Sequence, residues 1–241
     1  MLKANNISKR YGTQEVLSNI TLFYEKPEIV AILGPNGSGK STLLRCLSLI
    51  ESADSGQLSI IGQNFDFSEE IDTSLGIWPD VTLVFQQFFL WPNLKIRDNI
   101  LLPLKKRFPD SFQTIFDGIV QQFELEELLN KYPNQISVGQ KQKVALARAI
   151  ALKPKFLFLD EITSALDNLQ AAKISSILKQ LKEAGTIILL VTHSINFAIH
   201  NADSYIVLDK GLLVEQSIIS SIFKPQCNYL KNSITENGYL I

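Results

Sequence analysis

Cysteine is scarce in this chain, with 2 copies among 241 residues. Cys46 and Cys227 are far apart in the sequence, and neither has neighbours at the spacing that metal ligands require. We therefore expect neither a disulfide framework nor a cysteine-based metal site. Cys46 falls in an apolar segment, where a free cysteine commonly behaves as a small buried hydrophobic residue.

An excess of charge of one sign is also missing. The chain has 23 lysines and arginines against 24 aspartates and glutamates, so its formal net charge is -1 at pH 7. A protein that grips a nucleic-acid backbone gains its affinity from a surplus of basic side chains. This balance argues against nucleic acid as a partner.

Long apolar runs are absent as well, since no stretch approaches the roughly 18 consecutive apolar residues of a transmembrane helix. The first residues also lack the charged segment, apolar core and cleavage site of a secretory signal. We expect a cytoplasmic chain that does not itself span a membrane. Hydrophobic residues still make up 46% of the sequence, which suits a buried parallel sheet and a hydrophobic docking face.

The most informative segment is a loop with the spacing G-x-x-x-x-G-K-S. Its residues are Gly34, Pro35, Asn36, Gly37, Ser38, Gly39, Lys40, Ser41 and Thr42. The glycines allow positive φ angles and a close approach to an anion. Lys40 is placed to reach the β- and γ-phosphates of a nucleotide, and Ser41 to put its hydroxyl on Mg²⁺. ATP or GTP is therefore the first ligand to consider.

The sequence on both sides of this loop agrees with that interpretation. Residues 28–33 form a short apolar run that predicts a buried parallel strand. Leu43, Leu44, Leu47 and Ile50 follow at helical spacing and predict one buried helix face. The start of that helix would add its partial positive charge to the phosphate site.

The rest of the chain alternates strands and helices. Residues 1 to about 25, with a turn at Tyr11-Gly12, predict antiparallel strands, and prolines interrupt a helical pattern from about 88 to 150. Further strands are predicted at 57–61, 81–85, 156–159, 187–191 and 205–208. This pattern indicates an α/β fold with a mostly parallel sheet, an N-terminal antiparallel part and an inserted helical subdomain.

Two carboxylates end the apolar run 156–159, at the sheet edge where open α/β folds bind ligands. Asp160 is placed to hold Mg²⁺ through water, and Glu161 to polarise an attacking water. The run 187–191 ends similarly, with His193 as a candidate contact for the γ-phosphate. His200 lies within a helical pattern and is interpreted as an ordinary surface or core residue.

Ser137 and Gln140 match a capping box, in which a serine caps a helix and the residue three positions later reaches back. A capped helix start also binds anions, so capping and phosphate recognition are compatible interpretations. The local sequence does not decide between them.

Together these motifs resemble, in order and along nearly the whole chain, the ATP-binding subunits of ABC transporters. The loop resembles Walker A, the segment 158–161 the end of Walker B, and 164–167 the D-loop. Gln86 stands at the Q-loop position, the segment 137–140 at the signature motif, and His193 at the H-loop. The resemblance implies a P-loop NTPase (RecA-like) core over about 1–87 and 151–241, with the helical subdomain over about 88–150.

The resemblance also implies roles for these residues. Glu161 would be the general base, His193 would orient the γ-phosphate, and Gln86 would contact Mg²⁺ and report its presence to the transport partner. Tyr11, with Val16 nearby, would pack on adenine. Two such subunits would face each other head to tail, as a homodimer or heterodimer. The residues that would contact the ATP of the partner are Ser137, Gly139, Gln140 and Asp167.

Within the family, three local sequences look most like importers of polar amino acids. They are 43–47, the segment 84–92 and 191–198. This implies a chain peripheral on the inner face of the cell membrane, with transmembrane permease subunits and a solute-binding protein as partners. Residues 88–91 would form a groove for a short permease helix, or would equally pack the core of the helical subdomain.

Three residues depart from the family pattern. Val138 replaces the first glycine of the signature pair, and a β-branched residue does not readily adopt φ > 0. Ile162 stands where proline usually follows the catalytic glutamate, and Lys143 where arginine is common. We expect these changes to alter rates rather than abolish activity.

Other functions of the same fold remain open at this point. The nearest is the ATPase of an exporter or of a lipoprotein-release system, and an ABC protein without a transport role is another. ABC proteins of DNA repair or translation are disfavoured, because the stretch from Lys40 to Ser137 leaves no room for a long coiled-coil insertion. The transported solute is not encoded in these motifs.

Overall fold

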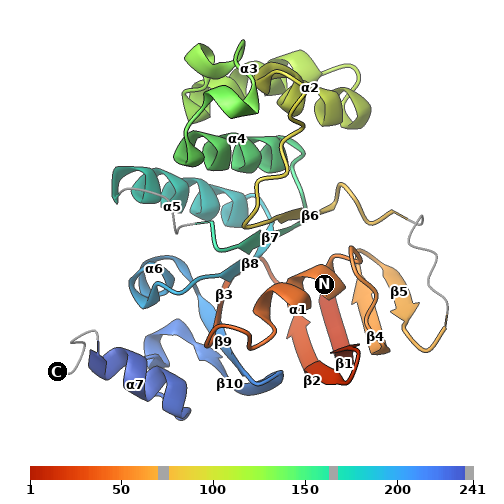
Figure 1. Cartoon of the computed structure of the whole chain (residues 1–241), viewed down its shortest axis with the longest axis vertical. Coiled ribbons are helices and arrows are strands. Elements are labelled where there is room, and N and C mark those ends of the chain that lie inside the picture. The colour runs from red at the N-terminus through yellow and green to blue at the C-terminus, as the bar shows by residue number, and fades with distance from the viewer. Residues whose placement is uncertain (70–75, 163–167, 237–241) are drawn as a thin grey trace.

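Two β-sheets of different kinds form the centre of the fold (Figure 1). The computed structural model describes residues 1–69, 76–162 and 168–236. Within them, one sheet has six strands in the order β10-β9-β3-β8-β7-β6, and the other has four in the order β2-β1-β4-β5. The predicted α/β class is confirmed.

The larger sheet is parallel except at one edge. Its parallel strands are β3 (Ile29–Leu33), β6 (Val81–Val84), β7 (Phe156–Asp160), β8 (Ile187–Val191) and β9 (Ser204–Asp209). The last strand, β10 (Leu212–Ile218), pairs antiparallel with β9. All residues of β3, β7 and β8 are buried, which explains why their sequences are continuous apolar runs.

The smaller sheet is antiparallel, as the first 25 residues predict. Its strands are β1 (Leu2–Tyr11), β2 (Gln14–Tyr24), β4 (Ser55–Ile60) and β5 (Gln63–Asp66). Gly12 has φ 60° in the turn between the first two strands, a conformation that glycine adopts without steric cost.

Helices cover both faces of the parallel sheet. On one side lies α1 (Lys40–Leu47) with the antiparallel sheet, and on the other lie α4 (Val138–Ala151) and α5 (Asn168–Glu183) (Figure 1). Farther out on the α4 side, α2 (Ile96–Arg107) and α3 (Phe112–Phe123) pack on α4. Toward the C-terminus follow α6 (Ile195–Asn201) and α7 (Asn228–Glu236). Short 3-10 turns occupy Glu126–Leu128, Pro133–Gln135 and Ile219–Ser221.

The two faces of the sheet bury two hydrophobic clusters. Along β3, Ala31 packs into the cluster with α2, α3 and α4, whereas Ile32 packs into the cluster with α1 and the antiparallel sheet. This division follows from the period of two along a strand. The first cluster runs from the sheet into α2 and α3, so the helices of the predicted helical subdomain share their core with the sheet.

One expectation about the end of an element needs correction, and two elements were missed. Ile50 does not lie on the buried face of α1, because the helix ends at Leu47 and Ile50 is 54% exposed. The hydroxyl of Ser48 donates to the carbonyl of Leu44 at 2.8 Å and closes the last turn. Sequence patterns also missed β10 and α7 at the C-terminal end.

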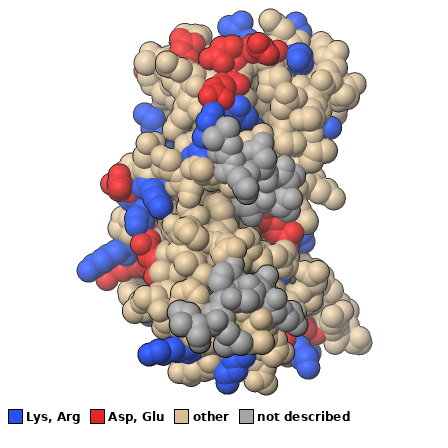
Figure 2. Space-filling model, turned by 90° about the vertical axis from the view of Figure 1, so that its left-hand side faces the viewer, with Lys and Arg blue, Asp and Glu red and all other residues tan. Residues whose placement is uncertain are grey.

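Charged side chains connect the helical subdomain to the core. Figure 2 shows acidic side chains gathered at the end of the molecule that the helical subdomain forms, with basic ones directly below them. Glu124, at the end of α3, pairs with Lys173 of α5 at 2.6 Å and with Lys143 of α4 at 3.7 Å. Lys143 thus has a partner in its own chain.

A buried carboxylate anchors the C-terminal segment. Glu215 of β10 accepts hydrogen bonds from the Tyr205 hydroxyl at 2.7 Å and from the backbone N–H groups of Gln226 and Cys227 at 3.0 and 2.7 Å. Burial acts to raise the pKa of Glu215, but these hydrogen bonds outweigh it and the pKa is lowered.

Glu215→Leu is expected to lower the free energy of unfolding by about 3 kcal/mol at neutral pH, because it removes the acceptor of the buried Tyr205 hydroxyl and of two part-buried N–H groups. Since the pKa of Glu215 is lowered in the folded protein, its contribution to stability is present above the usual carboxyl pKa of 4.5. That contribution is lost as the pH falls below this value. Urea unfolding at several pH values measures this, with the exposed Glu25→Leu as control. A difference between wild type and Glu215→Leu that does not shrink in acid would contradict this account.

Candidate active site

The predicted phosphate loop joins β3 to α1, as its pattern requires. Gly34, Gly37 and Gly39 have φ angles of 142°, 75° and 101°. A Cβ on Gly34 would lie 2.0 Å from the carbonyl oxygen of Leu208, and one on Gly39 would lie 2.6 Å from that of Val16. At Gly34 and Gly39 a side chain would clash with neighbouring backbone and would also be disfavoured by the positive φ. A side chain at Gly37 would meet open space, so only the positive φ disfavours it there.

The basic side chain of the loop points into it. Lys40 is buried, and its Nζ donates to the carbonyls of Gly34 and Pro35 at 2.9 and 2.8 Å. Burial lowers the pKa of Lys40, against the opposing effect of the carboxylates of Glu161 and Asp160. Those two side chains therefore lie close enough to the ammonium group to affect it.

The loop also has the features of an anion site. The hydroxyl of Ser38 is buried and has no hydrogen-bond partner among the described residues, and a phosphate oxygen would supply one. Asn36 and Gly37 form the exposed tip of the loop, and Thr42 is buried at the start of α1. These residues fit a nucleotide phosphate group.

Two predicted Mg²⁺ ligands meet directly. The hydroxyl of Ser41 donates to Oδ1 of Asp160 at 2.9 Å. Asp160 ends β7 and is 4% exposed, and burial raises the pKa of its carboxyl. No group of three or more His, Cys, Asp or Glu residues in the described ranges could hold a metal. A hydroxyl and one carboxylate suit Mg²⁺, which completes its coordination with phosphate oxygens and water.

Glu161 lies at the centre of a set of hydrogen bonds. Its Oε2 accepts from Nε2 of Gln86 at 2.9 Å, and its Oε1 lies 2.6 Å from Nε2 of His193. Gln86 follows β6, Glu161 follows β7 and His193 follows β8. Three neighbouring parallel strands thus deliver these side chains to one edge of the sheet.

The backbone of Glu161 adopts an uncommon conformation. Its φ is 53°, in the left-handed region, which costs roughly 1–2 kcal/mol for a residue other than glycine. The N–H of Glu161 donates to the carbonyl of Val191 at 3.1 Å. The next residue, Ile162, is buried, and its carbonyl accepts from Nε2 of Gln142 on α4. Sequence analysis missed Gln142, whose only signal is a glutamine on the otherwise apolar buried face of α4.

The predicted adenine residues flank the loop. Tyr11 ends β1 and is 45% exposed. Burial raises the pKa of its phenol, as does a hydrogen bond with Glu51, whereas one with Thr42 opposes the change. The backbone of Val16 packs against Gly39.

The capping box at the start of α4 is confirmed. Ser137 Oγ accepts from the N–H of Gln140 at 3.3 Å, and Gln140 Oε1 accepts from the N–H of Ser137 at 2.9 Å. Val138 does not need the positive φ that a glycine there suggested, because it is the first residue of the helix and its φ is not positive. Its side chain is 57% exposed.

The signature segment is separated from the phosphate loop of the same chain. Ser137, Gly139 and Gln140 start α4, which packs in one hydrophobic cluster, whereas α1 packs in the other, across the sheet (Figure 1). The fourth residue predicted to act with them, Asp167, lies outside the described residues.

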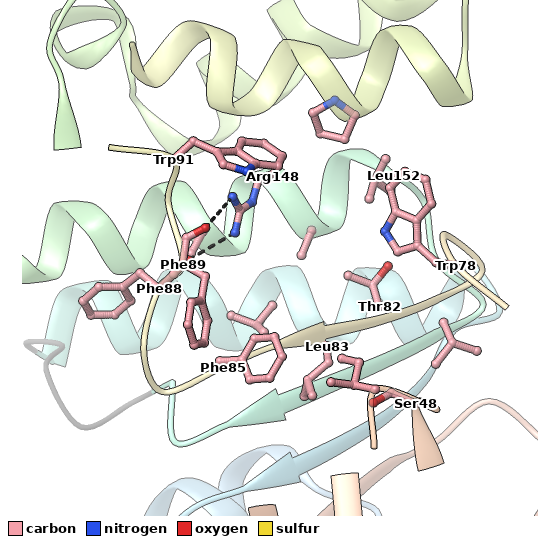
Figure 3. Close-up of a pocket in the computed structure, with 16 residues that line it drawn as sticks. Ser48, Trp78, Thr82, Leu83, Phe85, Phe88, Phe89, Trp91, Arg148 and Leu152 are labelled. Carbon is pink, nitrogen blue, oxygen red and sulfur yellow. Dashed lines mark hydrogen bonds between the residues drawn. The ribbon is translucent and has the colours of Figure 1, made fainter. Parts of the chain in front are cut away.

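A groove of about 440 Å³ opens between β6, the segment after it and α4 (Figure 3). Phe88, Phe89 and Trp91 line it, and the last two are exposed. Phe88 and Leu90 pack against the core. This segment therefore both lines a groove and packs against the core, and its contact with a permease helix stays a prediction.

Arg148 holds one wall of this groove. Its two terminal nitrogens donate to the carbonyls of Phe89 and Phe88 at 3.0 and 3.1 Å, and its guanidinium lies 5.1 Å from the Trp91 ring centre (Figure 3). The buried side chain of Asn99 makes four further hydrogen bonds with the backbone of residues 91–95.

Comparisons with known proteins agree with this geometry. The family model described as ABC transporter matches residues 17–164. The arginine transport ATP-binding protein ArtM of Bacillus subtilis (strain 168) is 37% identical over 89% of this chain and 90% of its own length. The glutamine transport ATP-binding protein GlnQ of Escherichia coli (strain K12) is 38% identical over the same shares.

A solved structure shows the same fold. The dimeric structure of MJ0796, a bacterial ABC transporter cassette, matches with a TM-score of 0.83 at 33% identity, over 91% of this chain and 99% of that one. Among the described residues, no helix is long and apolar enough to cross a membrane.

Gly34→Ala and Gly37→Ala form a matched pair that separates steric from conformational effects. Gly37→Ala is expected to lower the free energy of unfolding by about 1–2 kcal/mol, because only the positive φ disfavours alanine there. Gly34→Ala adds a clash with the Leu208 carbonyl, so we expect a larger loss of thermal stability and of ATP binding. Thermal melting and nucleotide titration measure both. Equal losses in the two variants would contradict this interpretation.

Proposed function

The chain belongs to the ABC transporter family of ATP-binding subunits and hydrolyses ATP, and we propose that it powers the import of a polar amino acid. The observation that carries the catalytic part is the position of Glu161, held by Gln86 and His193 beside the Ser41–Asp160 pair. The similarity to arginine and glutamine transport subunits supports the choice of solute class.

We assign the steps of hydrolysis to residues of this one sheet edge. The backbone of the phosphate loop and Lys40 bind the phosphates of ATP. Ser41 and Asp160 would hold Mg²⁺, with Gln86 beside them, and the ion would neutralise charge on the phosphate oxygens. Glu161 accepts the proton of the attacking water as general base. His193 contacts the γ-phosphate and orients the carboxylate of Glu161.

A second subunit completes the site in this proposal. Ser137, Gly139 and Gln140 lie across the sheet from the phosphate loop of their own chain, so they are positioned for ATP that another subunit holds. Asp167 is assigned to the same contact. The dimeric MJ0796 cassettes, one of them bound to ADP and phosphate, support this arrangement. The partner is a second copy or a related ATP-binding subunit.

The groove beside α4 is assigned to a short helix of a membrane permease. Its lining offers exposed aromatic rings, Phe89 and Trp91, on a backbone that Arg148 and Asn99 hold in place. Apolar anchors on a rigid rim are typical of protein interfaces. This contact would place the chain at the inner face of the membrane, and a solute-binding protein would deliver the amino acid.

Glu161→Gln tests the catalytic assignment. We expect hydrolysis to fall by about a thousandfold, because the amide cannot accept the proton, while ATP binding is kept and a dimer accumulates with ATP. Steady-state hydrolysis, nucleotide titration and gel filtration measure the three effects. Hydrolysis at the wild-type rate would refute the role of Glu161.

The transport assignment is tested in vesicles that contain this chain and the membrane subunits with which it co-purifies. We expect ATP-dependent uptake of arginine, glutamine or cystine.

Phe89→Asp places a charge in the apolar groove, so uptake is expected to fall about tenfold or more, while hydrolysis by the isolated chain persists. Phe23→Asp, at a similarly exposed site on β2, is the matched control. Export instead of uptake would overturn the proposed direction.

A further inference from the structure

A buried glutamine connects the signature helix to the residue after the proposed base. Gln142 lies on α4 and is 3% exposed. Its Nε2 donates to the carbonyl of Ile162, which directly follows Glu161. This contact joins two elements that are 20 positions apart in the sequence.

The contact bears on the backbone of Glu161. The residues before Glu161 belong to β7 and are paired with β8 in the sheet. The N–H of Glu161 itself donates to the carbonyl of Val191. After it, the carbonyl of Ile162 is held by Gln142. A residue persists in such a conformation only where the surroundings over-determine it. Among the described residues, Gln142 supplies a restraint on the C-terminal side of the turn.

The chemistry of Gln142 suggests that it is there to make a specific hydrogen bond rather than to fill space in the core. Its Oε1 is buried and accepts no hydrogen bond from the described residues. A half-satisfied amide is costlier than an apolar side chain of the same shape. The neighbours of Gln142 along the buried face of α4, such as Val144 and Ala145, are apolar. The feature that Gln142 adds to this face is the N–H group that binds Ile162.

The location of Gln142 also relates the two halves of the proposed site. It lies five positions after Ser137, in the same continuous helix, whose first turn is closed by the capping box. A shift of the start of α4 therefore moves the Gln142 amide with it. Through Ile162, that movement reaches the turn that carries Glu161.

We propose that Gln142 is a positioning residue for ATP hydrolysis, which holds Glu161 in its active geometry and links that geometry to the signature end of α4. The inference rests on the proposed role of Glu161 as general base. Gln142 touches neither the nucleotide nor the attacking water, and it acts through the Ile162 carbonyl.

Gln142→Met tests this, because methionine has a similar length and no N–H donor. We expect kcat for ATP to fall about ten- to a hundredfold, since small displacements of a catalytic group have effects of this size, with an unchanged KM. Gln113→Met, on the exposed surface of α3, is the matched control and should retain the wild-type kcat. An unchanged kcat in Gln142→Met would overturn the proposal.

Combining Gln142→Met with Glu161→Gln in one chain distinguishes the positioning role from a purely structural one. In that background Gln142→Met should leave ATP affinity and the ATP-dependent dimer unchanged, because the group that Gln142 positions is already inactive. Weaker ATP binding or dimer formation there would assign Gln142 to packing instead. Gln142→Leu serves as a second apolar variant, and failure of both to fold would also overturn the proposal.

The two proposals fail separately. If Glu161→Gln retains hydrolysis, the assignment of the base is wrong, and the positioning role of Gln142 is wrong with it. If Glu161→Gln loses hydrolysis and Gln142→Met does not, the base assignment stands and only the role of Gln142 is refuted.

Discussion

Glu161 adopts a left-handed backbone conformation at the end of a buried strand, and the geometry of the active site depends on how that turn is held. The restraints come from separate elements: Val191 at the end of β8, and Gln142 of α4 through Ile162. The side chain is fixed as well, by Gln86 and His193. A local conformation that costs energy is thus stabilised by contacts that are distant in sequence.

The parallel sheet determines which residues can act together in one chain. Its strand ends gather Gln86, Glu161 and His193 at one edge, next to the phosphate loop that follows β3. The same sheet separates α1 from α4, because alternate residues of each strand face different cores. The phosphate loop and the Ser137 helix cap therefore belong to different faces, which is the physical basis for proposing a two-subunit site.

Sequence analysis succeeded where a residue's role depends on its near neighbours. The strand, loop and helix around Gly34, the capping box at Ser137 and the apolar strands were all predicted correctly, since glycine, hydroxyl and apolar patterns act within a few residues. It failed at Ile50, where a helical period continued past the end of α1. It also expected a conflict between Val138 and a positive φ, which does not arise because Val138 begins a helix with ordinary φ. The expected effect of its side chain on contacts with a partner subunit stays a prediction.

The sequence by itself determined the nucleotide loop, the strand ends that carry the carboxylates, and the family resemblance. Only the tertiary structure showed that Glu161 is clamped from β6 and β8, that Phe89 and Trp91 line a groove beside Arg148, and that Gln142 reaches Ile162. The reason is that local patterns encode backbone conformation and burial. Hydrogen bonds between distant segments depend on strand order and helix packing, which no short motif specifies.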